Sequence, residues 1–414
     1  MNAKREAAGV VIRARSVVTM DGPVIDNGAV VVRGSRITEV GPFSQIGRGG
    51  ADELIDLGEC ALLPGLINAH CHLDYTGLRG KISRQRSFTD WIRAINEAKA
   101  SLTRDDYVRS IDDGFAEAAQ FGTTTIVNFV ADPAVLSSIQ PPRMRTWWLA
   151  EMIDVRREIS VPALRDEMRR AFPTMSNTGF GLAPHAPYTA SAKLYSDVSA
   201  AGAADDLLLS THLAESREEM EMFRSGSGEL FDFMSAIGRP MDDCGQGTPL
   251  ALLLQRGVLD ENWIVAHLNE LADDDLPSLR GSPRFHVAHC PRSHAFFGHA
   301  PFQMESLRAL GFNVCLGTDS LASNSDLGLF GEMQELSRVH PSLSPVEILA
   351  MVTVNPAKAL RRANELGKLR PGYVADLIAV PTHADRGNAL LDEMVNFEGN
   401  VAWSMVCGDQ LTSA

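Results

Sequence analysis

The stretch "LLPGLINAHCHLDYTGLRG", residues 62–80, is an apolar run that ends on His70-Cys71-His72 and then breaks into a polar loop punctuated by glycine. An apolar run of this length is typical of a buried strand. Because residues two apart on a strand point to the same face, His70 and His72 are expected to point the same way. Pairs of imidazoles are common ligands of a borderline-soft metal ion. The stretch therefore predicts a strand that presents two histidines to a metal.

Similar apolar runs recur along the chain and alternate with amphipathic stretches. We predict eight strands, at residues 61–72, 123–130, 145–153, 179–187, 206–215, 263–269, 284–291 and 311–319. Helical periodicity lies between them, for example at residues 105–122, 161–172, 248–258 and 302–311. Eight alternations of strand and helix predict an α/β fold, a closed (β/α)8 barrel of the TIM type.

The two ends of the chain have a different pattern. Residues 8–60 alternate short β-rich runs with turns, and the tail after Lys368 returns to short β runs. We therefore expect a small β-sandwich domain built from both ends, with its first part at residues 1–60 and its second part at 366–414. The barrel is expected to span residues 61–365.

Composition narrows the classes of partner. The 414-residue chain has 38 Lys and Arg against 52 Asp and Glu, a net charge of −14, which repels nucleic acid and anionic membranes. The sequence has no apolar stretch of membrane-spanning length and no secretory leader pattern at its start, so we expect a cytoplasmic protein. The six cysteines lie far apart and form no CxxC pair, so neither a disulfide framework nor a thiolate metal site is expected.

Six of the eight predicted strands end in residues that can do chemistry, and in barrel enzymes the active site lies at that end of the strands. A single histidine in a strand is more often a structural residue, and His286, His294, His299, His340 and His383 are open to that interpretation. A whole set at one end of the barrel favours a site. The set consists of His70, His72, His185, His212, Glu215, His267, His289 and Asp319.

As a series, the motifs "PGLINAHCH", "APHAPYTAS", "THLAES", "VAHCPRS", "LGTDSLAS", "NPAKAL" and "LRPGYVADL" resemble the amidohydrolase superfamily, in the family's order. The pattern is most similar to its mononuclear deaminase and chlorohydrolase branch. The resemblance implies one divalent metal, zinc or alternatively iron, held by His70, His72, His212 and Asp319, with His267 contacting water and substrate. Binuclear members carry a bridging lysine on the fourth strand. Between Lys99 and Lys358 this chain has only Lys193, which follows that strand, so a single metal is expected.

The same resemblance predicts hydrolytic deamination of an aminated heterocycle. Asp319 would accept a proton from the attacking water, while Glu215 would act as the general acid that protonates a ring nitrogen. The alternative for Glu215 is an ordinary acidic residue at a helix N-terminus, where the helix dipole favours negative charge. Relatives that hydrolyse C–Cl bonds tend to lack this glutamate, so its presence favours deamination.

Six residues, one of them from the set above, are candidates for substrate contact. His185 matches a substrate-contacting histidine of thioether-nucleoside deaminases, and Glu151 stands about where S-adenosylhomocysteine deaminases carry a carboxylate-binding arginine, which argues against that substrate. Trp91 could be an apolar wall or a core residue, and Glu97 could bind ribose hydroxyls. Arg292 and His294 could face the distal part of the substrate, as in the neighbourhood of 6-aminodeoxyfutalosine deaminases.

We therefore expect a deaminase of an adenine-type nucleoside, similar to 6-aminodeoxyfutalosine or a thioadenosine. The alternatives are a guanine or pterin deaminase, a hydrolase of a C–Cl, C–S or amide bond, and an inactive binding protein. The expected partner is a small aminated heterocycle. A homodimer is one alternative for the assembly, by analogy with barrels that pair through apolar helix faces.

Overall fold

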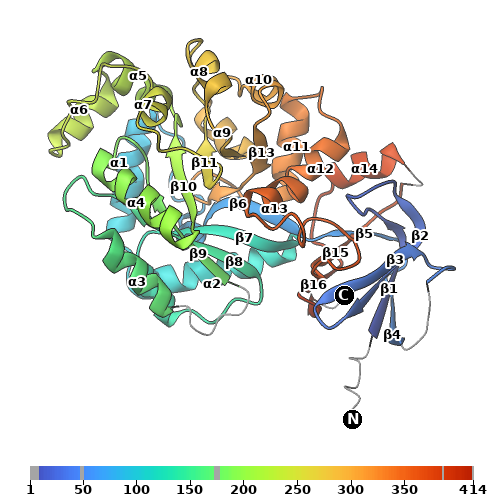
Figure 1. Cartoon of the computed structure of the whole chain (residues 1–414). Coiled ribbons are helices and arrows are strands. Elements are labelled where there is room, and N and C mark those ends of the chain that lie inside the picture. The colour runs from blue at the N-terminus through green and yellow to red at the C-terminus, as the bar shows by residue number, and fades with distance from the viewer. Residues whose placement is uncertain (1–8, 47–50, 172–177, 385–386, 413–414) are drawn as a thin grey trace.

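The computed structural model describes residues 9–46, 51–171, 178–384 and 387–412. Parallel strands form a barrel with helices packed around it, and a second, smaller sheet lies beside it (Figure 1). The barrel strands are β6 (Leu66–His72), β7 (Thr123–Val130), β8 (Arg145–Met152), β9 (Thr178–Pro184), β10 (Leu208–Leu213), β11 (Trp263–His267), β12 (His286–His289), β13 (Asn313–Leu316) and β14 (Asp319–Ser320). The predicted barrel is confirmed, with a strand in each of the eight predicted segments.

The barrel closes where the eighth predicted strand meets the first. That segment is divided into β13 and β14: β13 pairs with β12, and β14 pairs with β6. Gly317 lies between the two pieces, and a Cβ on it would stand 2.7 Å from the backbone oxygen of His70. A residue without a side chain is needed for this close approach, which brings Asp319 next to the histidines of β6.

The first predicted strand is also divided, at Gly65. Residues before it form β5 (Cys60–Pro64), which pairs with the smaller sheet, whereas β6 belongs to the barrel. A Cβ on Gly65 would stand 2.1 Å from Oγ1 of Thr124, so only glycine fits where the chain passes from one sheet to the other. This division explains why one apolar run serves two sheets.

The smaller sheet draws strands from both ends of the chain, as expected. Its outer strand β3 curls round to residues 372–375, since Ile37 N–H donates to the Tyr373 oxygen at 2.9 Å and Ala375 N–H donates to the Ser35 oxygen at 2.9 Å. A buried apolar cluster that includes Ile12, Leu62 and Trp403 fills the curled sheet. Its strands are β1 (Gly9–Val17), β2 (Ile25–Arg33), β3 (Arg36–Pro42), β4 (Ala51–Asp56), β5, β15 (Leu377–Pro381), β16 (Trp403–Val406) and β17 (Asp409–Thr412).

Helices surround the barrel, and a large apolar core fills the space between them and the strands. Among the described residues, no helix is long and apolar enough to cross a membrane. The α-helices are α1 (Phe88–Ala100), α2 (Arg104–Gln120), α3 (Val161–Ala171), α4 (Ala192–Asp205), α5 (Arg217–Ser225), α6 (Glu229–Ala236), α7 (Pro249–Gln255), α8 (Asp275–Gly281), α9 (Pro291–Phe297), α10 (Met304–Ala309), α11 (Leu329–Val339), α12 (Pro345–Ala350), α13 (Val354–Ala359) and α14 (Asn388–Val395). Short 3-10 helices follow two strands, η1 (Leu73–Leu78) and η2 (Pro133–Ser138).

Candidate active site

Four side chains from three strands converge at the C-terminal end of the barrel. Nε2 of His70 lies 3.7 Å from Oδ1 of Asp319, and Nε2 of His72 lies 3.9 Å from the same oxygen. His212 at the end of β10 completes the group, with its Nε2 3.2 Å from Nε2 of His72. All four residues are buried. The four proposed metal ligands therefore lie together, although they come from positions up to 249 apart in the sequence.

The ring nitrogens in this cluster have the character of metal ligands. His212 Nδ1 lies 2.8 Å from the backbone oxygen of His185, so this nitrogen carries the hydrogen and Nε2 is left bare. Burial and the neighbouring His70 lower the pKa of His72 well below its ordinary value, while burial and His185 do the same for His212, so both rings are neutral. The bare Nε2 of His212 lies 3.2 Å from Nε2 of His72, so the two neutral rings approach each other through the nitrogens that a metal ion could bind.

The unpartnered ring nitrogens of His70 also indicate that these side chains fit a metal ion. Both of its ring nitrogens, and Nε2 of His267, are buried without a hydrogen-bond partner among the described residues. Buried polar atoms normally have partners. Three neutral imidazoles and one carboxylate form a donor set that suits a divalent ion of borderline softness, so the residues present fit such a metal.

Asp319 is held in place by hydroxyl groups. Ser293 Oγ donates to its Oδ2 at 2.7 Å, Ser323 Oγ lies 3.3 Å from the same oxygen, and the Ser320 N–H donates to Oδ1 at 2.7 Å. Burial alone would raise the pKa of Asp319, but the nearby imidazoles of His70 and His267 hold it well below the ordinary value. Asp319 is therefore a carboxylate that can accept a proton.

Backbone strain gathers at the same place. The φ angles of Ala214, His267, Leu268 and Asp319 are 48°, 72°, 52° and 57°, which is the left-handed region that residues with side chains rarely adopt. Such conformations cost free energy and are often found at functional sites. Here they turn the chain after β10, at the end of β11 and at the start of β14, next to the ligand cluster.

Glu215 lies beside this cluster. Its Oε1 is 3.6 Å from Nε2 of His267, and only 6% of the residue is exposed. Burial, together with the charges of Asp319 and Glu219, raises the pKa of Glu215 well above its ordinary value. The site thus holds one carboxylate and one carboxylic acid, which is the pairing that acid–base catalysis requires.

A cavity of about 580 Å³ opens over the cluster and is lined by Asp319, Glu215 and His185. Its apolar side comes from α1 and α6, with Trp91 and Phe233 among the lining residues. Trp91 also packs against Phe88 and Phe297, with ring centroids 5.8 and 5.0 Å away, so it is both a wall of the cavity and part of a core. Glu151 lines the cavity as well, and burial raises its pKa to about 7.

Glu97 does not line this cavity. The α1 residues that do are Phe88, Trp91, Ile92, Ile95, Asn96 and Lys99, which recur at helical spacing on one face. Glu97 falls outside that face and is exposed. The expected ribose contact by Glu97 is therefore not supported. The polar α1 residues that line the cavity are Asn96 and Lys99.

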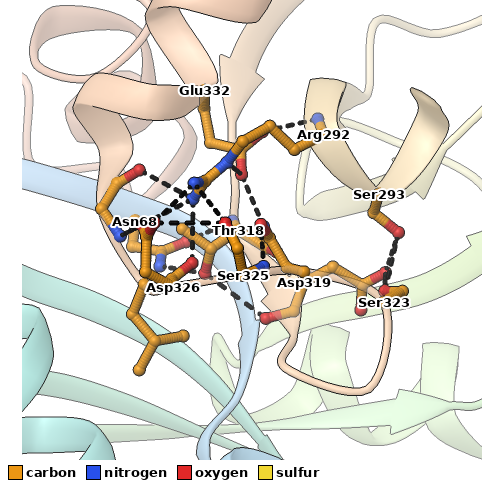
Figure 2. A network of polar contacts seen from close by, with 12 residues as sticks. Asn68, Arg292, Ser293, Thr318, Asp319, Ser323, Ser325, Asp326 and Glu332 are labelled. Atoms are coloured by element: carbon orange, nitrogen blue, oxygen red, sulfur yellow. Dashed lines mark hydrogen bonds and ion pairs between the residues drawn. The ribbon is translucent and has the colours of Figure 1, made fainter. Parts of the chain in front are cut away.

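Arg292 and His294 also lie outside the residues that line the cavity. The Arg292 side chain donates through Nε to Oε1 of Glu332 and through Nη1 to Oδ2 of Asp326, each at 2.9 Å (Figure 2). His294 Nδ1 lies 3.0 Å from Oδ1 of Asn269. Both side chains are occupied by protein partners, because α9 turns them away from the cavity and towards α11 and the turn after β11.

Sequence reasoning missed three residues of this region. Ser293 stands in the "CPRSH" motif, between Arg292 and His294, and Asn269 follows His267 by two positions. Lys99 lines the cavity and its Nζ lies 4.6 Å from the ring centroid of Tyr75. Of these three, only Ser293 stands in a motif that the sequence itself singles out. Asn269 and Lys99 make their contacts with residues distant in the sequence, and such contacts leave no local sequence pattern.

Residues 61–409 match the profile of the amidohydrolase family. A curated relative, 5-methylthioadenosine/S-adenosylhomocysteine deaminase of Pyrococcus furiosus, is 31% identical over 382 residues, which cover 86% of each chain. Among solved structures, an adenosine deaminase of Xanthomonas campestris with bound zinc is 22% identical, with a TM-score of 0.83 over 99% of this chain and 94% of that one. Helicobacter pylori aminofutalosine deaminase, solved with methylthio-coformycin, is 18% identical, with a TM-score of 0.83 over 97% and 100%.

Proposed function

Because the chain belongs to the amidohydrolase family, we propose that it is a metal-dependent hydrolase that deaminates an adenine-type nucleoside and releases ammonia. The observation that carries this proposal is the position of Glu215, a buried carboxyl group at the cavity wall, 3.6 Å from His267 and close to the ligand cluster. The activity named for the Pyrococcus relative supports the same reaction class.

The proposed metal ligands are His70, His72, His212 and Asp319, and zinc is the proposed ion, with iron as the alternative. A metal ion bound there acts as a Lewis acid that makes water nucleophilic near neutral pH. The zinc reported for the Xanthomonas structure supports this choice. His212 keeps the required tautomer through its bond to the His185 carbonyl.

The chain's own residues then move the protons. Asp319, the ionised carboxylate, accepts a proton from the attacking water while Glu215, the protonated acid, donates its proton to the ring nitrogen next to the carbon under attack. The C–N bond to the exocyclic amine breaks once that amine has received a proton from one of these two groups, and ammonia leaves. His267 has a ring nitrogen within 4.8 Å of a carboxyl oxygen of both Glu215 and Asp319, and it orients the water.

The cavity supports a nucleoside with a small apolar substituent. Its volume of about 580 Å³ is within the range of small-molecule sites. Phe233, Met234 and Ile237 form an apolar wall that suits a thioether or alkyl group. Glu151 lines the same cavity and disfavours a substrate carboxylate near it. A 5′-thioadenosine is therefore the first substrate to test, and aminodeoxyfutalosine the second.

The test is ammonia release by the zinc-loaded protein from a panel of adenosine, 5′-methylthioadenosine, S-adenosylhomocysteine, 6-aminodeoxyfutalosine, guanine, an aminated pterin and an aminated triazine. We expect ammonia from an adenine-type nucleoside, loss of that activity after chelation, and its return with zinc. Glu215→Gln should abolish the activity without loss of metal. Glu221 is an exposed glutamate on α5, the helix that follows Glu215, and Glu221→Gln should retain the activity. Release of another leaving group without ammonia would contradict the proposal. The cytoplasmic location, the lack of a nucleic-acid partner and a homodimer stay predictions.

A further inference from the structure

The peptide groups on both sides of the Glu215 Cα atom are held by hydrogen bonds. Its N–H donates to Oε2 of Glu219 at 2.7 Å, and its carbonyl oxygen accepts from Nδ2 of Asn269 at 3.0 Å. Glu219 and Asn269 are 0% and 3% exposed, so water does not compete for these bonds. The first bond resembles a helix cap, because Glu219 lies in the first turn of α5. The second bond comes from the turn after β11 and has no such local explanation.

Asn269 reaches Glu215 because the chain turns sharply after β11. His267 and Leu268 both have left-handed φ angles, which brings the following residues back towards the end of β10. Two backbone bonds hold this turn in place: Leu268 N–H donates to the Leu213 oxygen at 3.0 Å, and Glu270 N–H donates to the Ala214 oxygen at 2.9 Å. The Asn269 amide lies between these two bonds in the sequence.

The amide of Asn269 is itself fixed from the other side. Because its Nδ2 donates to the carbonyl of Glu215, its Oδ1 is free to accept, and Nδ1 of His294 lies 3.0 Å from that oxygen. His294 belongs to α9, and its neighbour Ser293 donates to Asp319 at 2.7 Å. One turn of α9 therefore contacts both acid–base groups of the site, Asp319 directly and Glu215 through Asn269.

We propose that Asn269, oriented by His294, is a positioning residue that fixes the backbone of Glu215 so that its carboxyl group faces the cavity. This inference rests on the proposed deamination with Glu215 as the acid. Asn269 lies outside the cavity lining, so it acts through Glu215 and not on the substrate. A general acid displaced by a fraction of an ångström loses rate while the binding surface is unchanged, so kcat should fall and KM should not.

The experiment compares Asn269→Ala and Asn269→Asp with Asn313→Ala. Asn269→Asp keeps the size of the side chain but lacks the N–H donor, and Asn313 is a matched amide at the other end of the barrel, where it donates to the Asn355 oxygen at 2.9 Å. For each variant, kcat and KM for ammonia release, metal per chain and the thermal midpoint are measured. We expect kcat to fall roughly tenfold to hundredfold in both Asn269 variants, with KM and metal content unchanged. Asn313→Ala should lower the thermal midpoint and leave kcat unchanged.

Two further comparisons separate positioning from a merely structural role. In a Glu215→Asp background, where the acid is already displaced, Asn269→Ala should cost much less than it does in the wild type. His294→Asn, which places an amide donor where Nδ1 stands, should keep more activity than His294→Ala. The inference is wrong if Asn269→Ala lowers kcat no more than Asn313→Ala does, if the loss follows metal content, or if its cost is the same in both backgrounds. If Glu215→Gln retains full activity, the proposed function fails and this inference fails with it.

Discussion

Ser293 and Asp319 form a 2.7 Å hydrogen bond, from the serine hydroxyl to Oδ2 of the carboxylate. The other oxygen, Oδ1, faces Nε2 of His70 at 3.7 Å. The bond therefore fixes the orientation of the carboxylate, with Oδ1 facing the ligand cluster and Oδ2 bound to Ser293. A metal ligand with two equivalent oxygens needs such a partner if only one of them is to face the metal.

Ser293→Ala should weaken both metal binding and turnover. Without the hydroxyl, Asp319 can rotate, and we expect roughly a tenfold to hundredfold loss in metal affinity or activity. Ser323→Ala is the matched control, because its hydroxyl lies farther from the same oxygen, at 3.3 Å, and its effect should be smaller. Zinc titration with a competing chelator, together with kcat at saturating zinc, checks this prediction. Equal effects of the two substitutions would contradict it.

Removing Arg292 should destabilise the fold without changing substrate affinity. Its partner Glu332 is 0% exposed, so Arg292→Met leaves a buried carboxylate without its cation and should cost about 3–5 kcal/mol of unfolding free energy. Arg292→Met combined with Glu332→Gln should recover much of that loss, because the buried charge is gone. Denaturant unfolding of the two variants, with KM for the active substrate, provides the measurement. A raised KM in the stable double variant would instead indicate a substrate contact.

Most of the candidate site could be predicted from the sequence, because the apolar runs locate the strands and so show which residues stand at their ends. Six of its residues stand within three positions of the C-terminal end of a strand, and the barrel brings those ends together. They are His70, His72, His212, Glu215, His267 and Asp319. The same logic located His185 and Glu151, which line the cavity.

Helix phase and long-range pairing could not be predicted in the same way. Residue type favours Glu97 as a polar contact, but its position in the turn of α1 places it outside the cavity lining, whereas Lys99 lines the cavity. Arg292 is an arginine near the site, yet a buried glutamate forty positions away determines its role. Strand ends at Gly65 and Gly317 depend on contacts with Thr124 and His70, which adjacent residues do not reveal.

Glu151→Gln should broaden the substrate range. Glu151 lines the cavity together with Lys99, and burial raises its pKa to about 7. Above that pH its carboxylate repels a substrate carboxylate, and a neutral amide removes this charge. We expect kcat/KM for S-adenosylhomocysteine to rise relative to 5′-methylthioadenosine, by roughly tenfold, the change that 1.4 kcal/mol corresponds to. The ratio for the two substrates is measured in both proteins. An unchanged ratio would show that Glu151 does not select against the carboxylate.

Glu219 should make the stability of the protein depend on pH. Burial raises its pKa to about 8, above the ordinary value of 4.5, so the folded protein binds a proton that the unfolded chain has already lost between these pH values. Stability from this group is therefore fully present below about pH 4.5 and is lost as pH rises through about 8. Glu219→Gln, which cannot ionise, should flatten this part of the profile.

The measurement is the thermal midpoint of wild type and Glu219→Gln between pH 5 and pH 9, with Glu221→Gln as the exposed control on the same helix. Because the carboxyl of Glu219 is buried and accepts the Glu215 N–H, both proteins should be similar at pH 5, where the acid is protonated. At pH 9 the variant should be the more stable of the two, by up to a few kcal/mol, since only the wild type must bury a charge there. Parallel pH profiles for the two proteins would show that Glu219 stays ionised in the fold, held by the backbone N–H groups around it, and that its burial does not raise the pKa.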